Sequence, residues 1–214
     1  MNIVTKKRET AWCDLWKRIG AGGDPEPTLR LLTEHYGEAH RAYHTLAHIQ
    51  ACLRVFEEAR HLAEQPDEVE FALWFHDAIY DTTASNNEVK SANLADQALQ
   101  SAGVTGSVRR RVMNLILATR HPSKPLAMDE QIMVDVDLSI LGEPAATFDA
   151  YDTAIRREYA WVPEEEYRRG RAALLRSFLG QDRIFHTTFF RARLENEARC
   201  NLVRALARIE NRPA

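Results

Sequence analysis

The stretch Pro66–Ile79, PDEVEFALWFHDAI, decides how this chain folds. Proline early in a helix and acids in its first turn are favoured, because the proline nitrogen needs no hydrogen bond there and the backbone dipole stabilises negative charge. Apolar side chains then recur every three or four residues, the period of one helix face; they are Val69, Ala72, Leu73 and Phe75. We expect an apolar helix that begins at Pro66 and ends near Ile79.

The same kind of pattern continues on both sides of this helix. Further helices are expected at about 11–19, 27–37, 45–63, 88–102, 107–119, 129–141, 147–160, 163–179 and 187–209. No segment alternates apolar and polar residues with period two for long enough to predict a strand. The chain also lacks internal repeats and linker-like segments. The sequence therefore predicts an all-α fold in a single domain, residues 1–214.

Composition excludes several classes of protein. The chain has 214 residues, 45% of them hydrophobic, and a formal net charge of −3. That apolar fraction is normal for a globular protein, and no apolar run approaches the roughly 18 residues that span a bilayer. The polar N-terminus is unlike a signal peptide, and three cysteines form no disulfide framework. We expect a cytoplasmic protein without a membrane partner, and the near-neutral charge makes a nucleic-acid partner unlikely.

Two histidine motifs could carry chemistry. His44 and His48 are four residues apart, so they project from one helix face, although such a pair also occurs on ordinary surfaces or in hydrogen-bonded cores. The dipeptide His76-Asp77 follows Trp74 at the edge of the core, where an uncompensated carboxylate is costly. A basic side chain or a metal ion must therefore compensate Asp77.

The segment around Asp137 offers another carboxylate. On a helical wheel the inward residues are Met133, Val136, Ile140 and Leu141, and Asp137 falls on the same side. Asp135 lies roughly 200° away and is expected to face solvent or an arginine. Asp137 is thus a metal ligand or the partner of an arginine.

Three further residues are weaker candidates. His121 ends a predicted helix, where the dipole favours a histidine without any functional role. Arg120 beside it is a candidate for phosphate contact, because a guanidinium matches phosphate oxygens. Glu88 could accept a hydrogen bond from a ligand imidazole, or it is an ordinary acid at a helix start.

Taken together, these residues form an inventory of metal ligands. A histidine, an adjacent His-Asp pair and a distant aspartate stand on separate helices, which can surround one cation in a bundle. Imidazole nitrogen and carboxylate oxygen suit a divalent ion such as Mn, Fe, Ni, Zn or Mg. Whether one or two ions bind is left open.

In these motifs the chain resembles the HD superfamily of metal-dependent phosphohydrolases. The stretch Tyr43–His48 is similar to the YHNxxH signature of cyclic-nucleotide phosphodiesterases, with Thr45 where asparagine is usual. A bacterial group of predicted HD phosphohydrolases shares YHxxxHI, WFHDxxYD, a following NE pair and DxDLSILG. The resemblance covers about residues 43–209. It implies an HD-type helical core at about 43–142, with C-terminal helices at about 147–209 packing on it.

The resemblance assigns roles residue by residue. It makes His48, His76, Asp77 and Asp137 metal ligands, and His44 the group that protonates the leaving oxygen. An alternative register makes His44 the ligand. In many HD proteins a small apolar residue follows the first ligand by four positions, and Cys52 after His48 fits that better than His48 after His44.

Three other assignments follow from the same comparison. Tyr80 departs from the histidine or glutamate of some relatives, and Asp81 is the candidate replacement as a catalytic group. Asp77 is also a candidate acceptor of a proton from water, if a second ion shares it. Arg120 and His121 are the candidate substrate-binding residues, and His121 alternatively ligates a second metal.

The expected function is hydrolysis of a phosphate ester, such as a nucleotide, in a small phosphorylated substrate. Two alternatives are open: an HD-fold di-iron oxygenase, which needs His121 and another histidine among the ligands, and a non-catalytic metal- or nucleotide-binding signalling module. The apolar C-terminal helix from Thr187 could pack within the subunit or form a homodimer.

Overall fold

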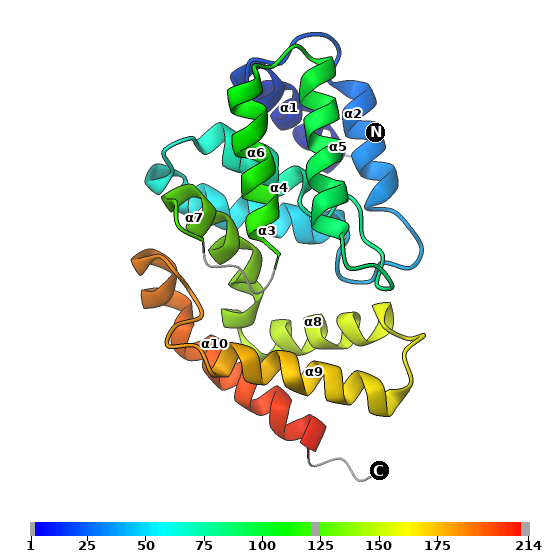
Figure 1. Ribbon diagram of the computed structural model, residues 1–214, viewed down its shortest axis with the longest axis vertical. Coiled ribbons are helices and arrows are strands. Elements are labelled where there is room, and N and C mark those ends of the chain that lie inside the picture. Colours follow the sequence, from blue (N-terminus) through cyan, green and yellow to red (C-terminus); the bar gives the residue numbers. More distant parts are fainter. Residues whose placement is uncertain (1–2, 121–124, 211–214) are drawn as a thin grey trace. The chain divides into compact units, whose positions relative to one another are not determined.

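The computed structural model describes residues 3–120 and 125–210. Within these ranges the chain folds into helices joined by turns and loops, without a strand (Figure 1). The predicted all-α fold is therefore confirmed. The chain divides into two compact units, Met1–Met133 and Val134–Ala214, and the boundary falls inside helix α7. The expected HD core, about 43–142, spans this boundary.

The first unit contains the helices up to the start of α7. They are α1 (Ile3–Arg18), α2 (Glu26–His35), α3 (Leu46–Ala59), the short 3₁₀ helix η1 (Arg60–Leu62), α4 (Pro66–Phe75), α5 (Asn87–Ser101), α6 (Gly106–Ala118) and α7 (Met128–Asp137). Helix α4 packs against α1, α3, α5 and α6, and α5 packs along α6. Helix α4 is thus the centre of this unit, which explains why it is apolar on nearly every side.

An aromatic cluster joins α1 to α4. Trp12 lies edge-on to Trp74, with ring centroids 5.3 Å apart, and Phe71 stacks on Phe75 at 4.8 Å. The indole of Trp12 donates to the carbonyl of Pro25, so its polar group is satisfied although the residue is buried. This packing fixes α4, whose C-terminal end carries the His76-Asp77 pair.

Helix α4 ends at Phe75, earlier than the expected Ile79. The carbonyl of Leu73 accepts from the His76 ring, and the carbonyl of Trp74 accepts from the Tyr36 hydroxyl. In a continuing helix these carbonyls would accept from the main-chain N–H groups four residues later. Side-chain donors therefore replace the next helical turn and turn the chain away at His76.

The second unit contains the end of α7, then η2 (Leu138–Gly142), α8 (Ala145–Glu158), α9 (Glu164–Leu179) and α10 (Thr188–Glu210). The helix expected at about 129–141 thus changes to a 3₁₀ helix after Asp137. Helix α10 packs against η2 and α9. At Gly142 a Cβ atom would lie 2.6 Å from the Cβ atom of Leu194, so only glycine allows this approach. Asn201 adds hydrogen bonds to the carbonyls of Leu141 and Glu143.

Asp135 corrects one expectation from the helical wheel. It is fully buried and does not face solvent. Its carboxylate accepts hydrogen bonds from the main-chain N–H groups of His186 and Thr187 and from the Thr187 hydroxyl, each at 2.7 Å. Burial raises the pKa of Asp135 to about 6, although these hydrogen bonds act in the opposite direction. The prediction was wrong because the wheel does not show that a carboxylate can be satisfied by the chain leading into α10.

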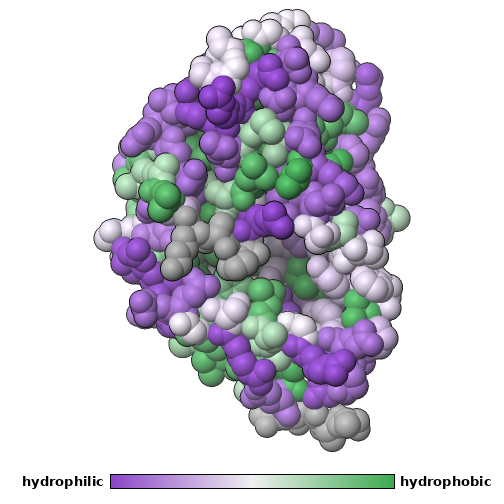
Figure 2. Space-filling view, in the orientation of Figure 1, coloured by the Kyte–Doolittle hydropathy of each residue, from purple (hydrophilic) through white to green (hydrophobic). Residues whose placement is uncertain are grey.

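Among the described helices, none combines the length and the apolar character that a bilayer crossing requires. Figure 2 shows one face of the molecule, on which hydrophilic residues dominate and hydrophobic ones form small separate patches.

Candidate metal centre

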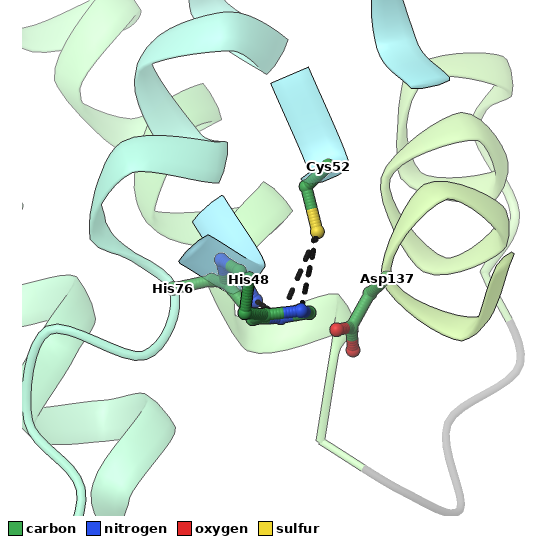
Figure 3. Close-up of side chains that lie close together, drawn as sticks. All are labelled: His48, Cys52, His76 and Asp137. Carbon is green, nitrogen blue, oxygen red and sulfur yellow. Dashed lines mark hydrogen bonds between the residues drawn. The ribbon is translucent and has the colours of Figure 1, made fainter. Parts of the chain in front are cut away.

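His48 stands in the first turn of α3. The preceding Thr45 has an extended backbone, and its hydroxyl accepts from the N–H of Ala47, which starts the helix. His48 is buried, and Cys52 is buried one turn further along the same helix. The Cys52 sulfur lies 3.6 Å from Nε2 and 3.7 Å from Nδ1 of His48 (Figure 3). Helix α3 therefore presents an imidazole with a thiol beside it.

His76 follows the last turn of α4 and is 1% exposed. Its Nδ1 lies 3.0 Å from the carbonyl oxygen of Leu73. Because a carbonyl only accepts, Nδ1 donates in this contact, and Nε2 is the ring nitrogen directed at His48 and Asp77. The fold therefore fixes the tautomer that can bind a metal ion through Nε2.

Three potential ligand atoms converge at this point. Nε2 of His76 lies 3.2 Å from Nε2 of His48 and 3.1 Å from Oδ2 of Asp77, and the distance from His48 Nε2 to that oxygen is 3.5 Å. Atoms bound about 2.1 Å from one metal ion lie about 3.0 to 3.4 Å apart in octahedral or tetrahedral sites. The triangle formed by His48, His76 and Asp77 therefore has the chemistry and spacing of a metal site.

The charge of Asp77 fits this arrangement. Burial would raise the pKa of its carboxyl group, but the imidazoles of His76 and His44 and the hydrogen bonds with His48 and His76 outweigh burial. They hold the pKa of Asp77 well below its usual range. Asp77 is therefore ionised at neutral pH, the form that binds a cation.

His48, Cys52 and His76 are buried and belong to a group of side chains that could hold a metal ion, and Cys52 is a candidate that the sequence analysis did not include among the ligands. Figure 3 labels His48, Cys52 and His76, and also Asp137, which belongs to the second unit. Asp137 is the last residue of α7 and is half-buried.

His44 lies beside the triangle rather than in it. Its ring stacks on Tyr80, with centroids 4.0 Å apart, and Tyr43 meets it edge-on at 5.0 Å. The ring centroids of His44 and His48 are 5.8 Å apart. The sequence analysis noted Tyr80 only as a departure from relatives. The structure shows that its ring packs on the ring of His44, a contact that the motif does not reveal.

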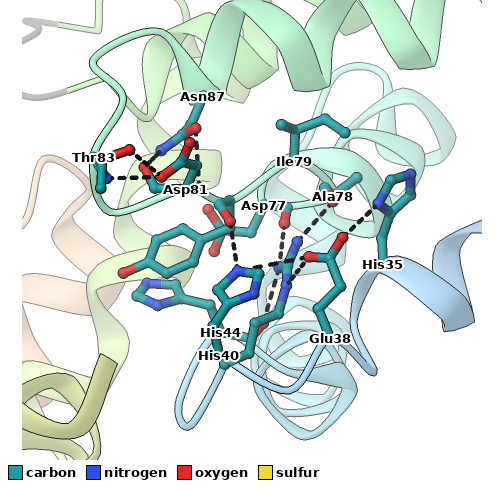
Figure 4. Close-up of polar contacts among 12 residues, drawn as sticks. His35, Glu38, His40, His44, Asp77, Ala78, Ile79, Asp81, Thr83 and Asn87 are labelled. Carbon is teal, nitrogen blue, oxygen red and sulfur yellow. Dashed lines mark hydrogen bonds and ion pairs between the residues drawn. The ribbon is translucent and has the colours of Figure 1, made fainter. Parts of the chain in front are cut away.

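Arg41 was missed altogether by the sequence analysis. Its side chain is 0% exposed, and it donates to the main-chain carbonyls of His44, Asp77 and Ala78. Its Nε also lies 3.0 Å from the carboxylate of Glu38 (Figure 4). An arginine that binds main-chain carbonyls leaves no pattern in the sequence, because those acceptors exist at every residue.

Asp81 stands at the surface in the loop after the His-Asp pair. Its carboxylate accepts from the N–H and the hydroxyl of Thr83, at 2.8 and 2.7 Å, and the hydrogen bond to Thr83 lowers its pKa. The Asn87 amide bonds the N–H and the carbonyl of Asp81, which closes the loop (Figure 4). The structure gives Asp81 a loop-ordering role, and its catalytic role stays a prediction.

The remaining candidates lie at helix ends. Glu88 is in the first turn of α5, where the helix dipole favours an acid. Arg120 is exposed just beyond α6. His121 lies outside the described residues, so its proposed contact with metal or phosphate stays a prediction.

No protein-family model, curated protein or solved structure matches this chain. What the site does must therefore be inferred from its own residues.

Proposed function

We propose that this chain is a metal-dependent phosphohydrolase that cleaves a phosphate ester in a small molecule. One observation carries the proposal: the His48, His76 and Asp77 ligand atoms form a triangle with sides of 3.1 to 3.5 Å. With Nδ1 of His76 bound to Leu73, Nε2 is directed at His48 and at the carboxylate of Asp77. A proton or a cation must lie between Nε2 and this carboxylate, and the motifs shared with the HD superfamily favour a divalent cation.

His48, His76 and Asp77 would hold the ion. The resemblance to the HD superfamily adds Asp137 to this set, and we keep Asp137 in the proposal as the fourth ligand. A bound divalent ion would lower the pKa of a water molecule and polarise a phosphoryl oxygen. Mixed nitrogen and oxygen ligands suit Mn, Fe, Ni or Zn, and the carboxylates also suit Mg.

His44 is the proposed general acid. Its ring stacks on the ring of Tyr80 and meets the ring of Tyr43 edge-on. It lies next to His48, a proposed ligand. An imidazole ring can hold a proton and release it to a departing alcohol oxygen. Arg120 and His121 are the proposed contacts for the substrate phosphate, and Asp81 a further catalytic group.

The proposal is tested by metal analysis together with a phosphate-ester screen. The purified protein should contain a divalent metal, lose it to a chelator, and regain turnover with Mn, Ni, Zn, Fe or Mg. The variants H76A and D77A should lose metal and turnover together, whereas R109K, at an ion pair between α5 and α6, should keep both. A protein that binds no metal contradicts the proposal. Bound metal without turnover favours a signalling module, and oxygen uptake by an iron-loaded protein favours an oxygenase.

A second pair of variants tests the register of the two histidines. We expect H44A to keep the metal and lose turnover, and H48A to lose both. If H44A empties the site while H48A keeps the metal, His44 is the ligand and the proposed assignment of the acid is wrong.

A further inference from the structure

We propose that Arg41 is a positioning residue that holds the acid His44 and the ligand Asp77 at a fixed separation. This inference rests on the proposed function, because it gives Arg41 a role in the same site.

Arg41 links two segments that are far apart in the sequence. One guanidinium nitrogen, Nη1, donates to the carbonyl of His44 at 3.0 Å and to the carbonyl of Asp77 at 2.7 Å. The other, Nη2, donates to the carbonyl of Ala78 at 2.8 Å. A single planar group therefore binds the main chain at both functional residues.

The chemistry of these acceptors explains why an arginine is needed. The carbonyls of Asp77 and Ala78 follow the end of α4, where the chain has left the helix and its hydrogen bonds. Arginine offers five donors in a rigid fork, whereas lysine offers a single flexible ammonium group. A lysine at position 41 could keep the charge but could not bind the three carbonyls in this geometry.

Contacts around the guanidinium fix its orientation. It lies over the rings of Tyr36 and Tyr80, 5.2 and 5.6 Å from their centroids, and Tyr80 in turn stacks on His44. The carboxylate of Glu38 accepts from Nε at 3.0 Å. Because the Arg41 side chain is fully buried, it acts through His44 and Asp77 and not by touching substrate.

The variant R41K tests the inference, with R111K as its matched control. Arg111 also forms a bidentate pair with a buried acid of this unit, Glu68, but it contacts neither His44 nor Asp77. Loss of a group that orients metal ligands typically costs about 10- to 100-fold in affinity or activity. We expect R41K to weaken Mn²⁺ binding in calorimetry by about 10-fold, with a similar loss of kcat on bis(p-nitrophenyl) phosphate, and R111K to change neither.

Hydrogen exchange supplies a readout that needs neither metal nor turnover. In R41K the main-chain amides of residues 40–45 and 76–80 should exchange faster than in R111K. This difference should remain even if the two variants have the same free energy of unfolding. If R41K does not fold, E38Q, which removes the charge of the half-exposed Glu38 that pairs with Arg41, His35 and His40, should shift the same amides and weaken Mn²⁺ binding in the same direction.

The outcomes separate the two proposals. Wild-type protein that binds no Mn²⁺ overturns the proposed function and this role with it. Wild-type protein that binds Mn²⁺ while R41K matches R111K in affinity and in exchange overturns the role of Arg41 alone.

Discussion

At the scale of single residues, the bond between His76 and Leu73 decides what the site can do. Without the Leu73 carbonyl, either ring nitrogen of His76 could carry the proton. With it, Nδ1 is the donor and Nε2 is directed at His48 and Asp77. The bond also lies at the end of helix α4, so one contact satisfies a carbonyl of the last turn and orients the ring.

The buried Glu68 allows a prediction about stability. Its carboxylate accepts hydrogen bonds from both Nε and Nη2 of Arg111. R111A should lower the free energy of unfolding by about 1 to 3 kcal/mol, because it leaves a buried acceptor unpaired. Urea unfolding measures this loss, and the double variant E68M/R111A should recover part of it; a double variant less stable than R111A would contradict the explanation.

At the scale of elements, close contacts between helices can be tested separately from the site. Gly142 in η2 faces Leu194 of α10, whose Cβ and carbonyl oxygen would lie 2.6 and 2.9 Å from an added Cβ. G142A should therefore lower the free energy of unfolding by about 1 to 3 kcal/mol through overpacking.

The matched control for G142A lies in the same unit. Gly170 is inside α9, and an added Cβ there would meet nothing within 4 Å. G170A should stabilise the protein by about 0.5 to 1 kcal/mol, because alanine loses less backbone entropy than glycine in a helix. Thermal unfolding of both variants should show shifts of opposite sign, and a loss in both would contradict the steric explanation for Gly142.

Helices α5 and α6 are joined by a bidentate pair between Asp96 and Arg109, at 2.7 and 2.8 Å. The hydrogen bond from Arg109 lowers the pKa of Asp96, so the pair stabilises the folded state above the ordinary pKa of an aspartate, about 4. As pH falls through the lowered pKa of the folded state, Asp96 becomes protonated and this contribution is lost. D96N should cost up to about 1 kcal/mol at pH 7 and progressively less below pH 4, measured by urea unfolding across pH. A difference that grows on acidification would contradict this sign.

At the scale of the whole molecule, metal binding should be coupled to folding. An ion that binds only the folded chain stabilises it by about 2.7 kcal/mol at one hundred times its Kd. Calorimetric unfolding should show a higher Tm with Mn²⁺ than with a chelator, and H76A should show no difference between the two conditions. If Mn²⁺ raised the Tm of H76A as much as that of the wild-type protein, the ion would bind at a site that does not include His76.

Much of the fold and part of the site could be predicted from the sequence. Helix α4 was expected from its proline, acids and apolar spacing, and the structure gives it the same start. His48, His76 and Asp77 were assigned as ligands from the resemblance to the HD superfamily, and the structure brings the three side chains together. The helical wheel misplaced Asp135, because a wheel uses only the apolar residues of one helix and does not show the N–H groups of residues 186 and 187, which lie elsewhere in the chain.

The sequence by itself determined the helices, because the period of apolar residues is a local property that each segment carries alone. Only the tertiary structure decided which nitrogen of His76 is directed at His48 and Asp77, where Tyr80 lies against His44, and that Arg41 joins two distant segments. These features depend on lone-pair directions and on main-chain carbonyls, which every residue possesses. Which carbonyls and which ring nitrogen make contacts therefore depends on how the helices pack, and residue type alone does not indicate it.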